Sequence, residues 1–259
     1  MRVQLVVKWN TILFTESEAN ILLWATSASR QEAYLRRYPE FRINHEGGVK
    51  FEMLGGRLQG TATVFQVDQE NILAVDDSFT AIPAGSAQST GIEFDLNGQI
   101  TDSIDFWLSY AYTDAETEDD FSDPNFGATI EAGTRLINVP ENQFSIQIAK
   151  DFDDQGLPLR AGAGALYVGE RLGQFGDFFG LDSQFGEFEL PDYLTFRAFA
   201  EYDVSEAISA RIDVDNIFDE EHFLNSFASL WVQPGAPRSV RGSLAYRFCL
   251  LYTSPSPRD

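Results

Sequence analysis

The first candidates for chemistry are four acidic side chains in one short segment, Asp213, Asp215, Asp219 and Glu220. Carboxylates at close spacing can hold a calcium ion. The twelve-residue calcium loop needs a Gly at its sixth position and a Glu at its twelfth, and this segment has neither. We therefore expect these acids to lie in a loop or on a water-facing surface.

Catalytic and metal-binding patterns are also missing elsewhere in the sequence. His45 and His222 are the two histidines, and neither has a partner at ligand spacing. The single Cys excludes an internal disulfide and a cysteine-rich zinc module. Because no Ser/His/Asp grouping is visible either, we expect no enzyme, no resident metal and no cofactor.

Composition narrows the class of partner. The chain has 40 acidic against 18 basic residues, a formal charge of −22 that should repel nucleic acid. Hydrophobic residues make up 44% and aromatic residues 14%, enough for a large ordered unit. The sequence holds no apolar run long enough for a transmembrane helix. A membrane protein stays possible, because barrel strands give a much weaker hydropathy signal.

The clearest element is the run RSVRGSLAYRF at residues 238–248. Its odd and even positions alternate between polar and apolar residues, which indicates a strand with one wet and one apolar face. Arginines on the wet face and an aromatic pair at the end of the apolar face suit a transmembrane barrel strand. An ordinary sandwich strand fits this run equally well.

The connections between strands decide between these alternatives. Short turns are expected at 55–56, 101–102, 153–158 and 205–207, and long loops at 76–88, 116–134, 172–190 and 219–237. Short turns at one end and long loops at the other are typical of an outer-membrane barrel. We predict an all-β fold, part of an antiparallel up-and-down transmembrane β-barrel with about nine or ten strands. A soluble ligand-binding barrel, with the apolar faces inside, is the alternative.

Several motifs in fixed order support the membrane reading: 91–116, LINVPENQFSIQIAKDF (136–152), LYVGER (166–171), DVDNIFDEEHF (213–223) and WVQPGAPRSVRGSLAYRF (231–248). Residues 46–248 resemble the C-terminal part of the barrel of TonB-dependent outer-membrane receptors of the ferric-siderophore type. Residues 1–45 stay unassigned, with a short helix and a strand both possible, and we expect residues 249–259 to be a non-native or disordered tail.

The resemblance implies a function and its partners. It implies a ligand-gated receptor for a ferric siderophore in the outer membrane of a Gram-negative bacterium, energised through TonB. A plug would fill the barrel, and we expect the plug and the TonB contact upstream of this chain. Gly162 and Gly164 are then expected to pack closely against the plug. A passive porin-like channel is the second alternative.

Candidate binding residues follow from position and type. The Phe-rich loop with Phe175, Phe178 and Phe179 could meet a ligand or fold over its own aromatics. Trp231 could bind ligand or belong to the interfacial aromatic belt. Arg135 and Arg171 flank loops and could meet an anionic chelate or form salt bridges in the lumen.

The end of the last strand is a candidate of a different kind. Leu244, Tyr246 and Phe248 form an apolar row at the C-terminal end of the expected barrel. By the same resemblance, we expect the outer-membrane assembly machinery to recognise this row.

Overall fold

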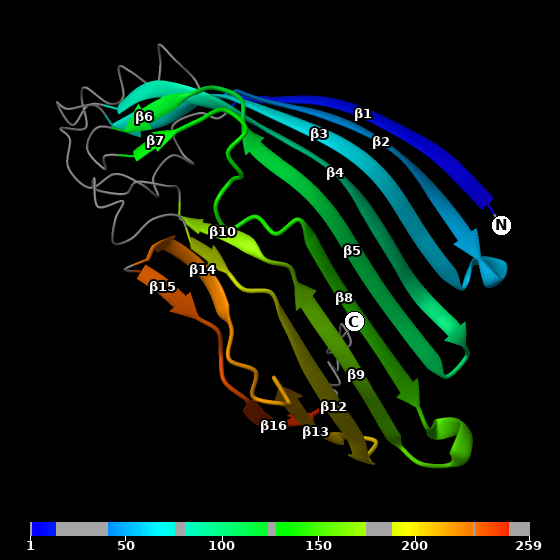
Figure 1. Ribbon diagram of the computed structural model, residues 1–259. Helices are drawn as coiled ribbons and strands as arrows, with labels where there is room; N and C mark the ends of the chain where they lie inside the picture. The colour runs from blue at the N-terminus through cyan, green and yellow to red at the C-terminus, as the bar shows by residue number, and fades with distance from the viewer. Residues whose placement is uncertain are drawn as a thin grey trace, which may run out of the picture.

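The computed structural model describes residues 2–13, 41–75, 81–123, 128–174, 188–229 and 231–248. Within these residues, ten strands form one antiparallel sheet in which the strands follow each other in sequence order. The sheet is strongly curved, like a trough with two open edges (Figure 1). This confirms the predicted meander of nine or ten strands.

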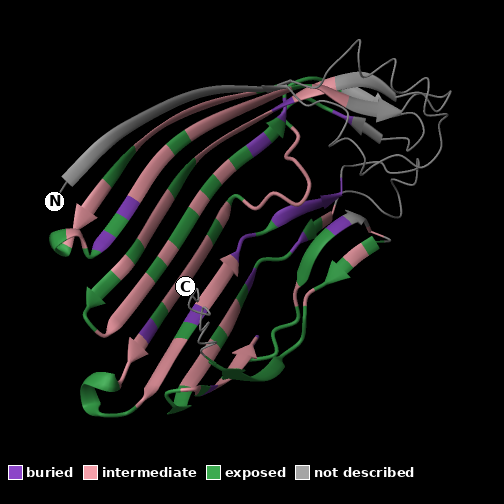
Figure 2. Cartoon of the chain, turned by 180° about the vertical axis from the view of Figure 1, so that it is seen from behind, coloured by how far each residue is buried: buried purple, intermediate pink, exposed green. Residues whose placement is uncertain are grey.

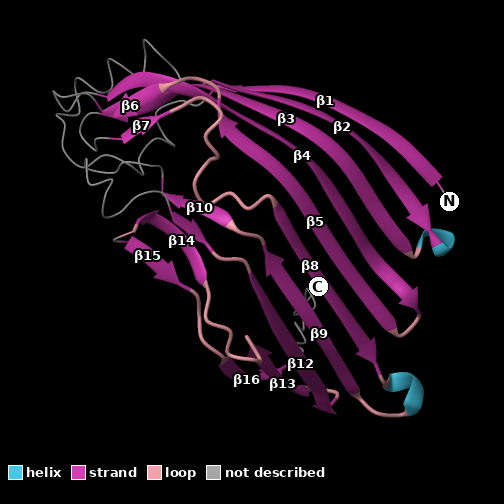
Figure 3. Ribbon diagram, in the orientation of Figure 1, coloured by secondary structure: helices cyan, strands magenta, loops and turns pink. Residues whose placement is uncertain are grey.

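The ten strands differ widely in length. They are β1 (Arg2–Leu13), β2 (Phe41–Met53), β3 (Leu58–Val75), β4 (Ala81–Thr101), β5 (Ile104–Thr117), β8 (Asn142–Asp151), β9 (Leu159–Val168), β12 (Tyr193–Ser205), β13 (Ile208–Asp215) and β16 (Ser239–Tyr246). The only helical elements among the described residues are two single turns, η1 (Leu54–Gly56) and η2 (Asp153–Gln155) (Figure 3).

Three small hairpins lie in the long connections. They pair β6 (Phe121–Asp123) with β7 (Ala128–Ile130), β10 (Arg171–Gln174) with β11 (Phe188–Leu190), and β14 (Phe223–Ala228) with β15 (Trp231–Pro234). Short turns join the strands at the opposite end. Following the usual architecture of such sheets, the end with the long connections faces the cell exterior.

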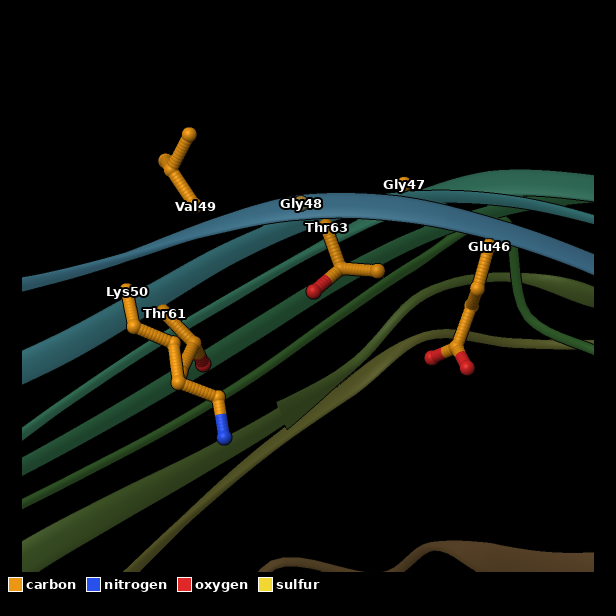
Figure 4. Close-up of a pocket in the computed structure, with 7 residues that line it drawn as sticks. All are labelled: Glu46, Gly47, Gly48, Val49, Lys50, Thr61 and Thr63. Carbon is orange, nitrogen blue, oxygen red and sulfur yellow. The ribbon is translucent and has the colours of Figure 1, made fainter. Parts of the chain in front are cut away.

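The two faces of the sheet carry different side chains. Figure 4 shows Val49 pointing away from the trough, while Lys50 and Thr61 point into it. Cross-strand register extends this assignment: Val64 lies opposite Gly47 on β2 and Ile92 on β4, so its row faces outward. The concave face is therefore polar and the convex face apolar.

The convex row is long enough to cross a membrane. On β12 it runs from Leu194 to Tyr202, both partly exposed. At about 3.3 Å per residue and a tilt of about 40°, this row is roughly 20 Å tall, close to the apolar band of outer-membrane barrels. Figure 2 shows intermediate and exposed residues alternating along most of the sheet, with few buried ones. A soluble barrel would bury these rows instead.

A polar cluster marks the outer limit of the apolar row. Gln66 and Gln88 each donate a side-chain hydrogen bond of 2.9 Å to Asp68. All three residues continue the convex rows of β3 and β4 toward the long connections. We infer that the hydrocarbon layer ends below this cluster, because the carboxylate and both amides need water nearby.

Two boundaries can be compared with the expectations from sequence. Residues 1–45, which the sequence leaves unassigned, contain β1, which pairs with β2 along its whole length. Residues 76–88 were expected to be a loop, yet β4 begins at Ala81 and pairs with β3 through two register shifts. These shifts accommodate Pro83, which has no amide to donate. The expected tail, 249–259, lies outside the described residues.

The expected loop at 116–134 and the expected turn at 153–158 leave residues 135–152 for one strand, and this stretch is too long. β8 begins only at Asn142. Asn138 has a φ of 63° and Pro140 has no amide, so neither residue suits a ladder. The segment before β8 is consequently irregular, and it contacts β10 and β14 of the small hairpins.

No described helix is long and apolar enough to cross a membrane.

A pair of neighbouring residues tests which face meets lipid. Leu108 lies in the convex row and Ser109 in the concave row. In a complete protein that contains this chain, Leu108→Arg should destabilise the inserted barrel by about 2–4 kcal/mol, because a charge then faces hydrocarbon. Ser109→Arg is the matched control and should insert normally. Heat-modifiable gel mobility of outer-membrane fractions measures both; equal insertion would contradict the assignment of the faces.

Candidate ligand-binding rim and charged inner face

The long connections meet in a compact rim above the sheet. We define the rim as the strand pair β10–β11, the strand pair β14–β15 and residues 131–141, taking only the described residues. All four residues of β10 are buried (Figure 2), which is unusual in this sheet protein. The contacts that bury β10 come from the other two parts of the rim.

Arg171 at the start of β10 is a central contact. Its side chain is among the largest fully buried ones, with a relative exposure of 1%. The guanidinium donates hydrogen bonds to the carbonyls of Phe223, Leu224 (3.1 Å) and Gly169 (3.4 Å). It also lies 5.5 Å from the ring centre of Tyr193. Burial lowers the pKa of Arg171, although an arginine remains cationic at neutral pH.

These contacts bear on the prediction that Arg171 binds a ligand. Its donors face backbone carbonyls of the next hairpin, and water does not reach the side chain. A direct contact with a chelate therefore stays a prediction, and the buried position favours a structural role.

A reciprocal pair ties the β14–β15 hairpin to the segment before β8. Asn138 donates 2.7 Å to the carbonyl of Ser226, and the Ser226 amide donates 2.8 Å to the Asn138 side-chain oxygen. The Ser226 hydroxyl donates to the carbonyl of Gly173. The side chain of Gln174 accepts a bond of 2.8 Å from the Ser229 amide. Buried polar groups paired in this way hold a single arrangement.

Arg135 lies at the same rim in an acidic setting. It donates 3.3 Å to Glu189, contacts Glu141 at 3.8 Å, and donates 3.4 Å to the carbonyl of Glu170. A hydrogen bond to Glu189, together with its charge, raises the pKa of Glu170, and Arg135 opposes this shift. An anionic ligand at Arg135 would have to compete with these carboxylates.

The remaining binding candidates are placed only in part. Trp231 begins β15 with a relative exposure of 56%, so it is open to water or ligand. It belongs to the hairpin that Arg171 contacts. Phe175, Phe178 and Phe179 lie outside the described residues. The structure thus brings Arg135, Arg171 and the hairpin of Trp231 to one rim.

The sequence motifs NIFD and GAPR contact each other at the base of the rim. Asn216 donates 2.9 Å to the carbonyl of Glu220 and 3.1 Å to that of Ala236, and its oxygen accepts 2.8 Å from the Glu220 amide. Asp219 accepts 2.7 Å from the Arg238 amide. Both Asn216 and Asp219 have positive φ values. The sequence analysis identified both motifs but did not predict the contact between them. Asn and Asp are frequent in tight turns, so Asn216 and Asp219 were the available signal for it.

The four acids that open the sequence analysis separate in the structure. Asp213 is a salt-bridge partner on the inner face, and Asp219 fixes a loop. His222 packs on Tyr193 with ring centres 4.5 Å apart. No group of three or more possible ligands is placed to hold a metal ion anywhere in the described part of the chain.

The inner face carries ion pairs near the end with the short turns. Arg160 reaches across the buried Ala149 to Asp105, at 2.5 Å. Arg211 contacts Asp213 at 2.7 Å and Glu201 at 3.3 Å, and stacks 4.1 Å above the ring of Phe199. Such pairs are costly in hydrocarbon, so this face must be wet or covered by polar protein.

Gly162 leaves room for this arrangement. A Cβ at Gly162 would lie 2.5 Å from the Phe199 ring, and one at Gly164 would lie 3.2 Å from the Arg197 side chain. Side chains of the neighbouring strand therefore lie directly beside these glycines, and the packing of Gly162 and Gly164 against a plug stays a prediction.

The last strand presents its apolar row openly. Leu244 is 78% exposed and Phe248 68%. Tyr246 and Phe248 stack with ring centres 6.1 Å apart. This geometry suits recognition by another protein or by lipid.

Comparison with known proteins agrees with the fold. The family model described as TonB dependent receptor-like, beta-barrel matches residues 30–217. The chain belongs to the TonB-dependent receptor β-barrel family. It lies, like its relatives, in the outer membrane of Gram-negative bacteria.

Individual relatives are siderophore or metal-chelate receptors by name. The chain is 34% identical to the metal-pseudopaline receptor CntO of Pseudomonas aeruginosa (strain UCBPP-PA14), over 81% of this chain and 28% of the relative. It is 29% identical to the ferrioxamine B receptor of Salmonella typhimurium (strain SL1344), over 78% and 28%. The crystal structure of the siderophore receptor PiuA from Acinetobacter baumannii superposes with a TM-score of 0.67 at 25% identity, covering 80% and 28%. The chain therefore spans a little over a quarter of the length of these relatives.

The contact between the two motifs predicts a stability effect. Asn216→Ala removes three hydrogen bonds from a buried residue and leaves Ala at a φ of 50°. We expect the receptor barrel to lose roughly 2–4 kcal/mol of stability. Asp219→Ala also leaves Ala at a positive φ but removes only one bond, at an exposed position, and should cost roughly 1–2 kcal/mol. Thermal unfolding of the detergent-solubilised receptor measures both, and equal losses would contradict the assigned roles.

Proposed function

We propose that the complete protein is an outer-membrane receptor that imports a metal–siderophore complex, with energy supplied through TonB. The observation that carries the proposal is the combination of a lipid-facing convex row with a charged inner face below an ordered rim. The names of the relatives support a chelated metal as ligand. Residues 46–248 provide part of the barrel wall in this proposal.

The rim supplies the first contacts of the ligand. Trp231 offers an exposed aromatic surface, and Arg135 offers a cation among carboxylates. The candidate aromatics Phe175, Phe178 and Phe179 lie outside the described residues and follow β10 directly in sequence. Arg171 lies buried below this surface and contacts the hairpin that carries Trp231. The plug and the TonB contact belong to parts of the receptor outside this chain.

Uptake in cells tests the proposal. The complete receptor is expressed in a receptor-deficient, iron-starved strain with and without TonB, and uptake of labelled ferrioxamine B, metal-loaded pseudopaline and a ferric catecholate is measured. We expect saturable, TonB-dependent uptake of at least one chelate. Trp231→Ala should raise the half-saturation concentration for that chelate about tenfold, because the loss of one aromatic contact can weaken binding by this factor. Leu157→Ala, at an exposed turn of the opposite end, is the control.

The outcomes separate the alternatives. Uptake that continues without TonB and never saturates would indicate a passive channel. Failure of all three chelates would contradict the ligand class.

We also propose that Leu244, Tyr246 and Phe248 form the signal that the outer-membrane assembly machinery reads. The stacked aromatics Tyr246 and Phe248 at the end of the exposed row support this proposal, because they offer a defined apolar surface for binding.

Substitution in the last strand tests the assembly signal. In the complete receptor, Phe248→Ala should lower the membrane-inserted fraction several-fold at an unchanged level of synthesis. Phe218→Ala is the matched control, since Phe218 is 72% exposed but lies at the opposite end of the sheet. Pulse-labelling followed by outer-membrane fractionation gives the inserted fraction. Equal insertion of both variants would show that Phe248 is an ordinary interfacial residue.

A further inference from the structure

Buried polar side chains join the parts of the rim, beside the buried apolar residues Leu172 and Leu190. Arg171, Gln174 and Ser226 have relative exposures of 1%, 1% and 3%. Leaving such groups without partners in a buried place costs free energy, so each one constrains the segment that satisfies it. The partners here lie on connections far apart in sequence, with separations of 53 to 88 residues.

Two anchors fix the direction of the β14–β15 hairpin. The Arg171 guanidinium bonds to the successive carbonyls of Phe223 and Leu224, where β14 begins. Asn138 bonds to both backbone groups of Ser226, further along the same strand. Two separate points of attachment define the axis of a strand. The exposed residue Trp231 then projects from a hairpin that has no freedom to rotate.

The same anchors join the other two parts of the rim. Arg171 begins β10, and the Asn138 amide donates 2.8 Å to the carbonyl of Leu172 on that strand. Ser226 in turn reaches Gly173. The described parts of the three connections that follow β5, β9 and β13 therefore form one hydrogen-bonded body, so a disturbance of one anchor should loosen all three.

We propose that Arg171 is a positioning residue: it holds the β14–β15 hairpin in the orientation that binds the chelate, and with Asn138 it makes the rim a single preformed unit. A preformed site binds more tightly because less ordering remains to be done on binding. The proposal rests on the proposed function for its ligand, but its structural part holds without one.

The experiment has two independent readouts on the complete receptor. Hydrogen–deuterium exchange in detergent follows the amides of residues 223–228 and 134–138 without ligand. Cell uptake of labelled ferrioxamine B, metal-loaded pseudopaline and a ferric catecholate gives the half-saturation concentration and the maximal rate. The variants are Arg171→Met, which keeps the length of the side chain but no donors, and Arg171→Lys, which keeps the charge.

Arg57 provides the matched control. It pairs with Asp102 at 2.7 Å at the short-turn end of the sheet, and its side chain is 44% exposed. Arg57→Met should change neither readout.

We expect Arg171→Met to speed exchange about tenfold in both segments, as the loss of charge-assisted hydrogen bonds allows. The half-saturation concentration should rise about tenfold and the maximal rate should change less than about twofold, because the assembled transporter is intact. Arg171→Lys should restore part of both effects, since one ammonium cannot serve three carbonyls as the planar guanidinium does.

Asn138 gives a second route if Arg171→Met does not insert. Asn138→Gly suits the φ of 63° and removes both bonds to Ser226, whereas Asn138→Asp keeps the acceptor. Asn138→Gly should speed exchange at residues 223–228 more than Asn138→Asp does. The double variant Arg171→Lys, Asn138→Asp should show less than the sum of the single effects, as expected for two anchors of one body.

Unchanged exchange at residues 223–228 in Arg171→Met, or in Asn138→Gly if the former does not insert, would overturn the proposal. Faster exchange with an unchanged half-saturation concentration would also overturn it, because the hairpin would then be held without consequence for binding. If the unaltered receptor takes up none of the three chelates, the proposed ligand class fails, and the exchange data alone decide whether Arg171 and Asn138 unite the rim.

Discussion

The structure depends on one constraint: in hydrocarbon, every backbone amide and carbonyl must find a partner within the protein. An antiparallel ladder between sequential strands meets this need and forces side chains to alternate between two environments. The convex face then carries rows such as Leu194 to Tyr202, and the concave face carries pairs such as Arg211 with Asp213. Lipid on one side and water on the other explain why this chain has almost no conventional core.

Where the backbone leaves the membrane, a different solution appears. Buried apolar residues such as Leu172 and Leu190 contribute to the packing of the long connections but do not satisfy the backbone groups there. Instead, side chains such as Asn216, Asn138 and Arg171 replace the missing ladder with bonds to backbone groups of distant loops. Positive φ values at Asn138, Asn216 and Asp219 show how these turns are made. Side-chain to backbone hydrogen bonds therefore order the rim, close to water. The sheet below is ordered by lipid on one face and water on the other.

The sheet could be predicted because its signal has a period of two and repeats along the chain. The strand at 238–248 and the alternation of short turns with long loops were sufficient for the topology. Contacts within the rim could not be predicted, since Arg171 and Leu224 are far apart in sequence and nothing local in LYVGER indicates burial. β1 was missed because it carries no sustained alternation, and only its pairing with β2 makes it a strand.

The order of the strands has an evolutionary consequence. Each strand of the large sheet is hydrogen-bonded only to the strands before and after it in sequence. Duplicating or deleting one hairpin would therefore change the width of the sheet without reversing the direction of any other strand. The polar and the lipid-facing sides of the sheet would also stay the same. A single strand could not be gained or lost in this way, because every later loop would move to the opposite surface of the membrane. Such sheets should therefore gain or lose strands two at a time during evolution.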